Sequence, residues 1–123
     1  MKFTTEEELR KIMEMLAEAD FEKAGCRVAE EGVFSVETAR PLQEKRKAAG
    51  LFRKEEKSWG RCQLIIRHVE GMSIWEEFDA RPFGGALLDL EKSGGVFLIH
   101  LRSARGLRID LKVSRLEGQL QDL

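Results

Sequence analysis

Apolar residues recur at helical spacing near the N-terminus of the chain. Four of them follow the i, i+3, i+4, i+7 pattern that places side chains on one side of a helix: Leu9, Ile12, Met13 and Leu16. Thr5 and Glu8 have the spacing of a capping box, and Gly25 can end the helix after Ala24. We therefore expect an amphipathic helix that packs on another layer of the fold.

Further along the chain, apolar and polar residues alternate on both sides of three triplets that end in glycine. These triplets are Glu30-Glu31-Gly32, Val69-Glu70-Gly71 and Ala104-Arg105-Gly106. A three-residue hairpin loop favours glycine at its last position, because φ is positive there. Pairing outward from each triplet opposes apolar residues with apolar residues, whereas a shift of one residue opposes them with charged ones. The pattern therefore predicts three antiparallel hairpins.

Each hairpin has a predicted register. The expected pairs are Val28 with Phe34 and Cys26 with Val36 in the first hairpin, His68 with Met72, Ile66 with Ile74 and Cys62 with Phe78 in the second, and Leu101 with Ile109, Ile99 with Leu111 and Phe97 with Val113 in the third. Gly94-Gly95 forms a further turn, which places the strand from Ala86 to Lys92 beside the strand from Val96 to Arg102. In this register the odd-numbered residues from Phe97 to Val113 face the core.

These elements predict an α+β fold, in which the N-terminal helix covers one face of a hairpin-built antiparallel sheet of about seven strands. A sheet of this size is expected to curl strongly or to close in part into a barrel. A length of 123 residues suits a single domain, residues 1–123. Pro41 is expected to open a second, mostly polar helix that ends near Gly50. The pattern leaves open whether residues 51–60 are helix, strand or loop.

The composition of the chain indicates in which cellular compartment the protein is expected. Hydrophobic residues make up 42% of the chain and charged residues 35%, and the net charge is −1. No apolar run approaches the roughly 20 residues of a membrane-spanning helix, and the acidic N-terminus lacks a signal sequence. We expect a cytoplasmic protein without a membrane partner. Cys26 and Cys62 fall on apolar strand faces and belong to no C-x-x-C motif, so we interpret them as inert core thiols.

The predicted register gathers ionisable residues on the face opposite the core. Asp89, His100 and Asp110 form one row across three strands, and carboxylates beside a histidine favour its protonated form. Arg102 opposes Arg108, which is unfavourable unless an anion lies between them. The row is either a recognition site or an exposed sheet face with cross-strand ion pairs, and we favour the second interpretation.

Two exposed apolar residues add a candidate patch. Trp75 points to the side opposite Ile74 and, in the predicted second hairpin, lies next to Ile65. An apolar patch on an outer face more often indicates a second layer or subunit than a small ligand.

The sequence shows no nucleophile motif, no phosphate-binding glycine loop and no set of metal ligands at a compact spacing, so we expect no metal and no cofactor. Our first hypothesis is a non-enzymatic protein that binds a protein partner or itself through the sheet face. The alternative is an enzyme or small-ligand carrier with a pocket on a curved sheet, lined by residues such as His68 and His100. The second alternative is nucleic-acid binding through the basic residues 40–61, which interleaved glutamates weaken.

Overall fold

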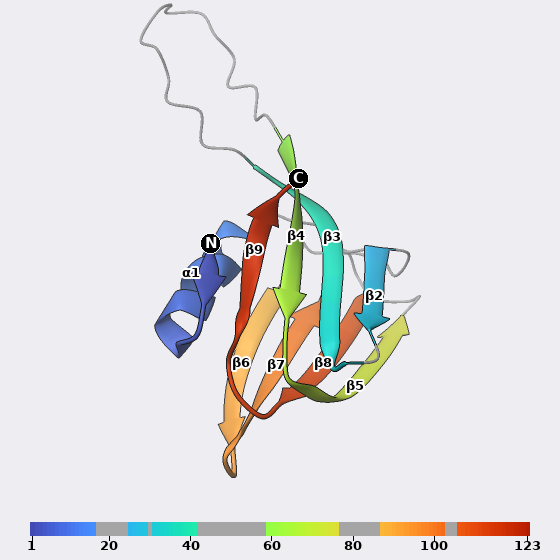
Figure 1. Cartoon of the computed structure of the whole chain (residues 1–123). Coiled ribbons are helices and arrows are strands. Elements are labelled where there is room, and N and C mark those ends of the chain that lie inside the picture. Colours follow the sequence, from blue (N-terminus) through green and yellow to red (C-terminus); the bar gives the residue numbers. More distant parts are fainter. Residues whose placement is uncertain (17–24, 30, 42–58, 77–86, 103–105) are drawn as a thin grey trace, which may run out of the picture.

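The computed structural model describes residues 1–16, 25–29, 31–41, 59–76, 87–102 and 106–123. This part of the chain contains one helix and nine strands, labelled in Figure 1 where there is room. In chain order they are β1 (Lys2–Phe3), α1 (Glu6–Met15), β2 (Cys26–Ala29), β3 (Val33–Pro41), β4 (Trp59–Ile66), β5 (Val69–Glu76), β6 (Leu87–Ser93), β7 (Val96–Arg102), β8 (Leu107–Val113) and β9 (Gly118–Asp122).

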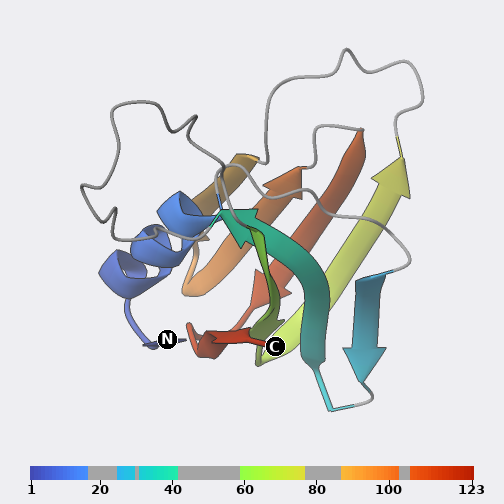
Figure 2. The same ribbon diagram turned by 90° about the horizontal axis from the view of Figure 1, so that it is seen from above.

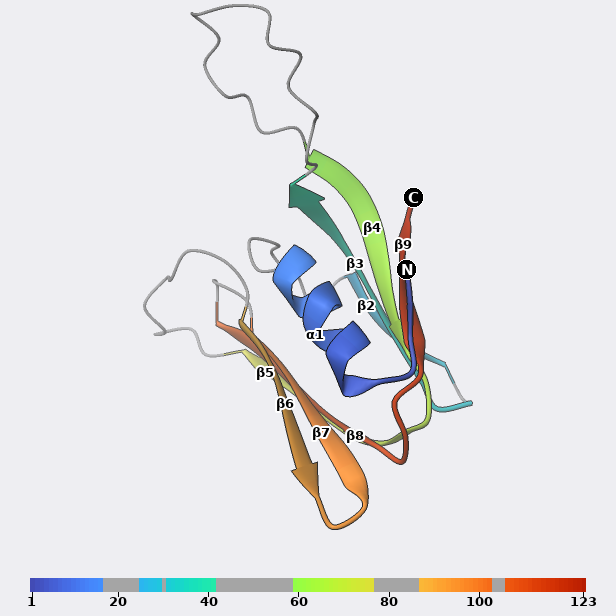
Figure 3. The same cartoon turned by 90° about the vertical axis from the view of Figure 1, so that its left-hand side faces the viewer.

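The strands form two antiparallel sheets rather than one. The first sheet has five strands in the order β1-β9-β4-β3-β2, and the second has four in the order β5-β8-β7-β6. Figure 2 shows the two sheets as separate layers, and Figure 3 shows that α1 lies between them on one side. The predominantly antiparallel architecture with one short helix is confirmed. The expected single sheet of about seven strands is not, and the described strands close no barrel.

The N-terminal helix forms as predicted. The Thr5 side chain accepts a hydrogen bond from the Glu8 backbone N–H at 3.2 Å, which caps the helix. The predicted stripe is buried, with Leu9, Ile12 and Leu16 at most 1% exposed. The expected extension from residue 17 to residue 24 lies outside the described residues. Pro41 is the last residue of strand β3, and the second helix expected after it lies in residues 42–58, outside the described part.

The first and third predicted hairpins have the expected registers. In the first, Val28 lies opposite Phe34, and Gly32 has a φ of 73°. In the third, β7 and β8 pair with Ile99 opposite Leu111. The turn at Gly94-Gly95 is also confirmed, since both glycines have positive φ and His100 lies opposite Asp89. The local turn signals in the sequence therefore predicted these three registers correctly.

The second predicted hairpin, around Val69-Glu70-Gly71, is wrong. Strand β4 pairs with β3 and β9, whereas β5 pairs with β8 in the other sheet. The chain changes sheets at His68, which has a φ of 59°. Its carbonyl accepts a hydrogen bond from the Ser114 N–H at 3.1 Å, where the chain crosses back from β8 to β9. Gly71 lies at a β-bulge in β5 instead of a turn.

Both sheets and α1 contribute to one hydrophobic cluster. The odd-numbered positions of β7 and β8 supply buried residues, among them Ile99, Leu101 and Ile109, as the sequence predicts. Strands β1 and β9 were not predicted. They add the buried residues Phe3 and Leu120, and β9 lies between β1 and β4. Within the described part of the chain, the helix is too short and too polar to cross a bilayer.

Candidate functional site

The outer face of the four-stranded sheet carries the predicted row of ionisable residues. Burial of the odd-numbered residues of β7 and β8 turns the even-numbered ones outward. His100 lies opposite Asp89 on β6 and opposite Asp110 on β8. Strand β5 extends this row with Ser73, which lies opposite Asp110. Of Asp89, the structure describes the backbone position alone.

His100 is held between two carboxylates. Its Nδ1 lies 2.6 Å from Asp110 Oδ1, and its Nε2 lies 3.2 Å from Glu91 Oε2. The hydrogen bond to Asp110 is the largest influence on the pKa of His100 and raises it; partial burial opposes this rise, and Glu91 adds to it. A protonated His100 therefore links β6, β7 and β8 across the sheet.

Arg108 connects this row to Trp75. The guanidinium carbon of Arg108 lies 5.0 Å from the centre of the Trp75 ring, in the range of a cation–π interaction. Arg108 Nε lies 3.8 Å from Asp110 Oδ2. These contacts reduce the cost of placing Arg108 opposite Arg102, as the register requires. Arg102 itself is exposed.

The predicted patch of Ile65 with Trp75 does not form, because the two residues belong to different sheets. Ile65 lies on β4 opposite Ser35 and Gln119, and it is half-buried. Trp75 lies on β5 opposite Arg108 and is 49% exposed. The direction of Trp75 away from the core was predicted correctly, but its neighbour was not.

The outer face of the five-stranded sheet is different in character. Gln119 donates to Gln121 at 2.8 Å, and Gln121 donates to Gln63 at 3.0 Å. Arg61 and Glu37 pair at 3.2 Å on the same sheet. These polar groups satisfy one another within the sheet. The exposed tryptophan of the other sheet therefore makes that sheet the better candidate for binding.

A cavity of about 510 Å³ lies elsewhere, beside the start of α1. It is lined by Thr4, Thr5, Glu6, Lys92, Phe97, Arg115, Leu116 and Glu117. The pocket residues that the sequence suggested, His68 and His100, are not among them. The sequence reasoning missed this place because three lining residues follow β8 in a segment that was not recognised as a crossing between sheets.

The structure bears on the remaining candidates to different degrees. Most of the basic segment, residues 42–58, lies outside the described residues. Among the residues that are described, no group of three or more potential metal ligands comes together. Burial raises the pKa of the Cys26 and Cys62 thiols, which keeps them protonated and unreactive near neutral pH.

No family model matches the sequence, and comparisons with curated proteins and with solved structures give no significant match. The function is therefore argued from the geometry alone.

Proposed function

We propose that the protein is a non-enzymatic binding protein that acts through the outer face of its four-stranded sheet and associates there with a second copy of itself. The observation that carries this proposal is the half-exposed Trp75 ring, held against Arg108 on a sheet whose other face is packed in the core. The buried thiol of Cys62 suits a reducing compartment, and we place the function in the cytoplasm.

The residue types support protein binding. Tryptophan and arginine are the side chains most enriched among those that dominate interface energies. Here both side chains are positioned before binding. Strand β8 is paired with β5 on one side and with β7 on the other, and Ile109 beneath the face is fully buried. A rigid, preorganised surface loses less conformational entropy on association than a mobile loop.

The distribution of charge supports self-association. One row across the face carries Arg102 and Arg108, the next row carries Asp110 beside His100, and the row beyond it carries Glu91 and Lys112. In a two-fold dimer each residue contacts its counterpart reciprocally, so a basic row of one copy can meet an acidic row of the other. Charge complementarity of this kind favours a single mutual orientation.

Sedimentation equilibrium over a range of protein concentrations tests the proposal. We expect a reversible monomer–dimer equilibrium whose dissociation constant rises at least about ten-fold in Trp75→Ala, because the ring is an exposed anchor. Arg108→Glu should weaken the dimer further by placing like charges across the interface. Arg61→Glu is the matched control, because Arg61 is 74% exposed on the outer face of the other sheet.

Two results would contradict the proposal. One is a monomer at every concentration up to about 1 mM, the range in which weak association is still detectable. The other is a dimer that Arg61→Glu weakens as strongly as Trp75→Ala and Arg108→Glu do, because association would then not be specific to the proposed face.

A further inference from the structure

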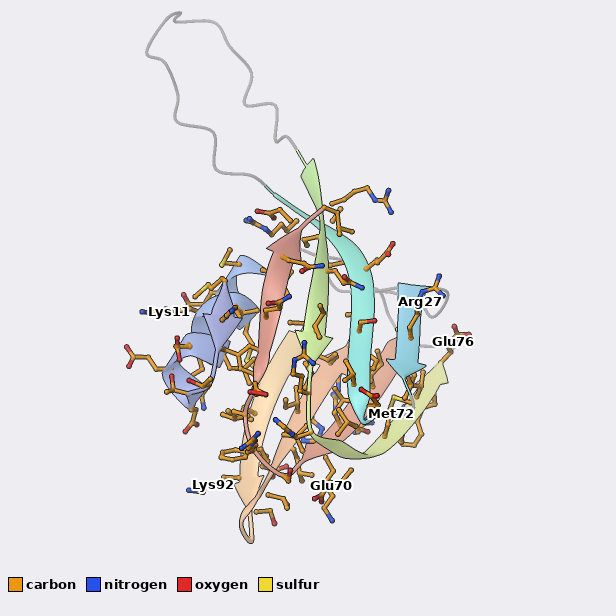
Figure 4. The ribbon with its side chains drawn as sticks, in the orientation of Figure 1. Lys11, Arg27, Glu70, Met72, Glu76 and Lys92 are labelled. Carbon is orange, nitrogen blue, oxygen red and sulfur yellow. The ribbon has the colours of Figure 1, made fainter. Side chains whose placement is uncertain are left out.

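The cavity beside α1 combines an apolar floor with two cationic side chains. Phe97 packs against the hydrophobic cluster, and Leu116 is buried with 7% exposure. Lys92 Nζ lies 5.8 Å from the centre of the Phe97 ring. Figure 4 shows Lys92 at the lower end of β6, below α1. The volume of about 510 Å³ lies within the usual range for small-molecule sites.

Arg115 is held in place by His68. Arg115 Nε donates to His68 Nε2 at 2.9 Å. His68 is fixed in turn by its positive φ and by the hydrogen bond between its carbonyl and Ser114. An arginine anchored through Nε keeps its two terminal nitrogens free to bind both oxygens of a carboxylate.

Two acidic residues, Glu6 and Glu117, also line the cavity. Glu6 pairs with Arg10 at 3.0 Å, and Glu117 Oε1 lies 2.9 Å from His68 Nε2. The contact with His68 is the main cause that lowers the pKa of Glu117. One ring nitrogen cannot donate to Glu117 and accept from Arg115 at once, so His68 either holds Glu117 or anchors Arg115, and in the second case Glu117 interacts with Arg115 instead.

Lys92 is therefore the charge left for a ligand, and Arg115, which lies near Glu117, can join it. Within the described residues, no carboxylate lies within ion-pair distance of the Lys92 ammonium, and its one recorded contact is with the Phe97 ring. A cation next to an apolar surface favours a ligand with an anionic head and an apolar body.

We propose that this cavity binds a small carboxylate that carries an apolar tail or ring. The apolar part lies on Phe97 and Leu116, and the carboxylate lies between Lys92 and Arg115. His68 is a positioning residue that orients Arg115. This site is separate from the outer face of the four-stranded sheet, so the test of ligand binding is independent of the test of self-association.

Titration with sodium octanoate near pH 7.5, followed in ¹H–¹⁵N spectra, tests the proposal. We expect saturable shifts concentrated at Phe97, Arg115 and Leu116. Octylammonium has the same tail with the opposite charge, and inorganic phosphate is an anion without a tail. Both should bind at least about ten-fold more weakly than octanoate, because one carries the wrong charge and the other leaves the apolar floor uncovered.

Substitutions test which cationic side chains contact the carboxylate of the ligand. Arg115→Gln and Lys92→Gln should each weaken octanoate binding about ten-fold, the loss expected for one charge-assisted contact. Lys11→Gln is the matched control, because Lys11 is an exposed cation that points away from the sheets on α1 (Figure 4). His68→Asn tolerates a positive φ but loses the ring nitrogen, and it should reduce the preference for octanoate over octylammonium.

Three results would overturn the proposal. The first is the absence of saturable shifts up to about 20 mM octanoate, well above the range of a specific site. The second is equal binding of octanoate and octylammonium, which would indicate apolar adsorption alone. The third is equal binding of octanoate and phosphate, which would indicate a non-specific anion contact.

Discussion

Protonated His100 should stabilise the fold through its cross-strand contacts, and His100→Gln isolates this contribution. Glutamine is of similar length and can hydrogen-bond, but it cannot carry a positive charge. The contact with Asp110 is short, at 2.6 Å, and the side chains of His100 and Asp110 are 25% and 28% exposed. Glu91 is 64% exposed, so its contact adds little.

The expected magnitude follows from the kind of hydrogen bond. A neutral amide can still donate a hydrogen bond to the Asp110 carboxylate, so the substitution removes only the attraction between the two opposite charges. For a partly exposed pair this should cost up to about 1 kcal/mol in the free energy of unfolding when His100 is protonated. The cost should approach zero when His100 is neutral.

The sign of the pH dependence follows from the raised pKa of His100. The folded state binds the proton more tightly than the unfolded state, so the extra stability is fully present below the ordinary histidine pKa of about 6.5. It is lost as the pH rises through the higher pKa of the folded state. The penalty of His100→Gln should accordingly be larger in acid than in alkali.

Urea unfolding followed by far-ultraviolet circular dichroism measures this difference. The wild type and His100→Gln are compared at about pH 5.5 and about pH 9, on either side of the histidine range. Asp110→Asn should remove most of the pH-dependent difference, and Lys112→Gln, on the next row, should leave it unchanged. An equal penalty at both pH values, or a larger one in alkali, would refute the reasoning.

Two further predictions concern the core. Gly118→Ala should reduce the free energy of unfolding by about 2–3 kcal/mol or more, because the new Cβ would overlap the Ile65 carbonyl oxygen and lie 2.5 Å from the Phe3 ring. Gly71→Ala is the control. Its Cβ would lie 3.7 Å from its nearest neighbour, so it should cost much less in the same urea assay. Cys62 is fully buried, so its thiol should react with a disulfide reagent only as fast as the protein unfolds, and a rapid reaction in the folded state would contradict its placement in the core.

Local signals in the sequence were sufficient for three of the strand pairings. A glycine with positive φ specifies a tight turn, and the turn aligns the residues on both sides of it. Gly32, the pair Gly94-Gly95 and Gly106 act in this way. The row through His100 was predicted because its three positions lie on strands joined by such turns.

The same signal was misleading at Gly71. A glycine within an alternating pattern is consistent with a turn and with a β-bulge, and the bulge occurs here. The actual change of direction is at His68, which adopts a positive φ without being glycine. The His68 carbonyl accepts from Ser114, and the next residue, Val69, donates to the Gly32 carbonyl; both partners are distant in the sequence, so no local pattern indicates this conformation.

The pairing of β5 with β8 accounts for both candidate sites. At one end it brings Trp75 beside Arg108, and at the other it brings Val69 beside Val113. Directly beyond that second end, His68 meets Arg115 at the cavity. This pairing joins segments separated by β6 and β7, which is why periodicity identified the charged row but neither the tryptophan–arginine contact nor the cavity. The residues that we propose for binding are therefore those that long-range sheet topology brings together.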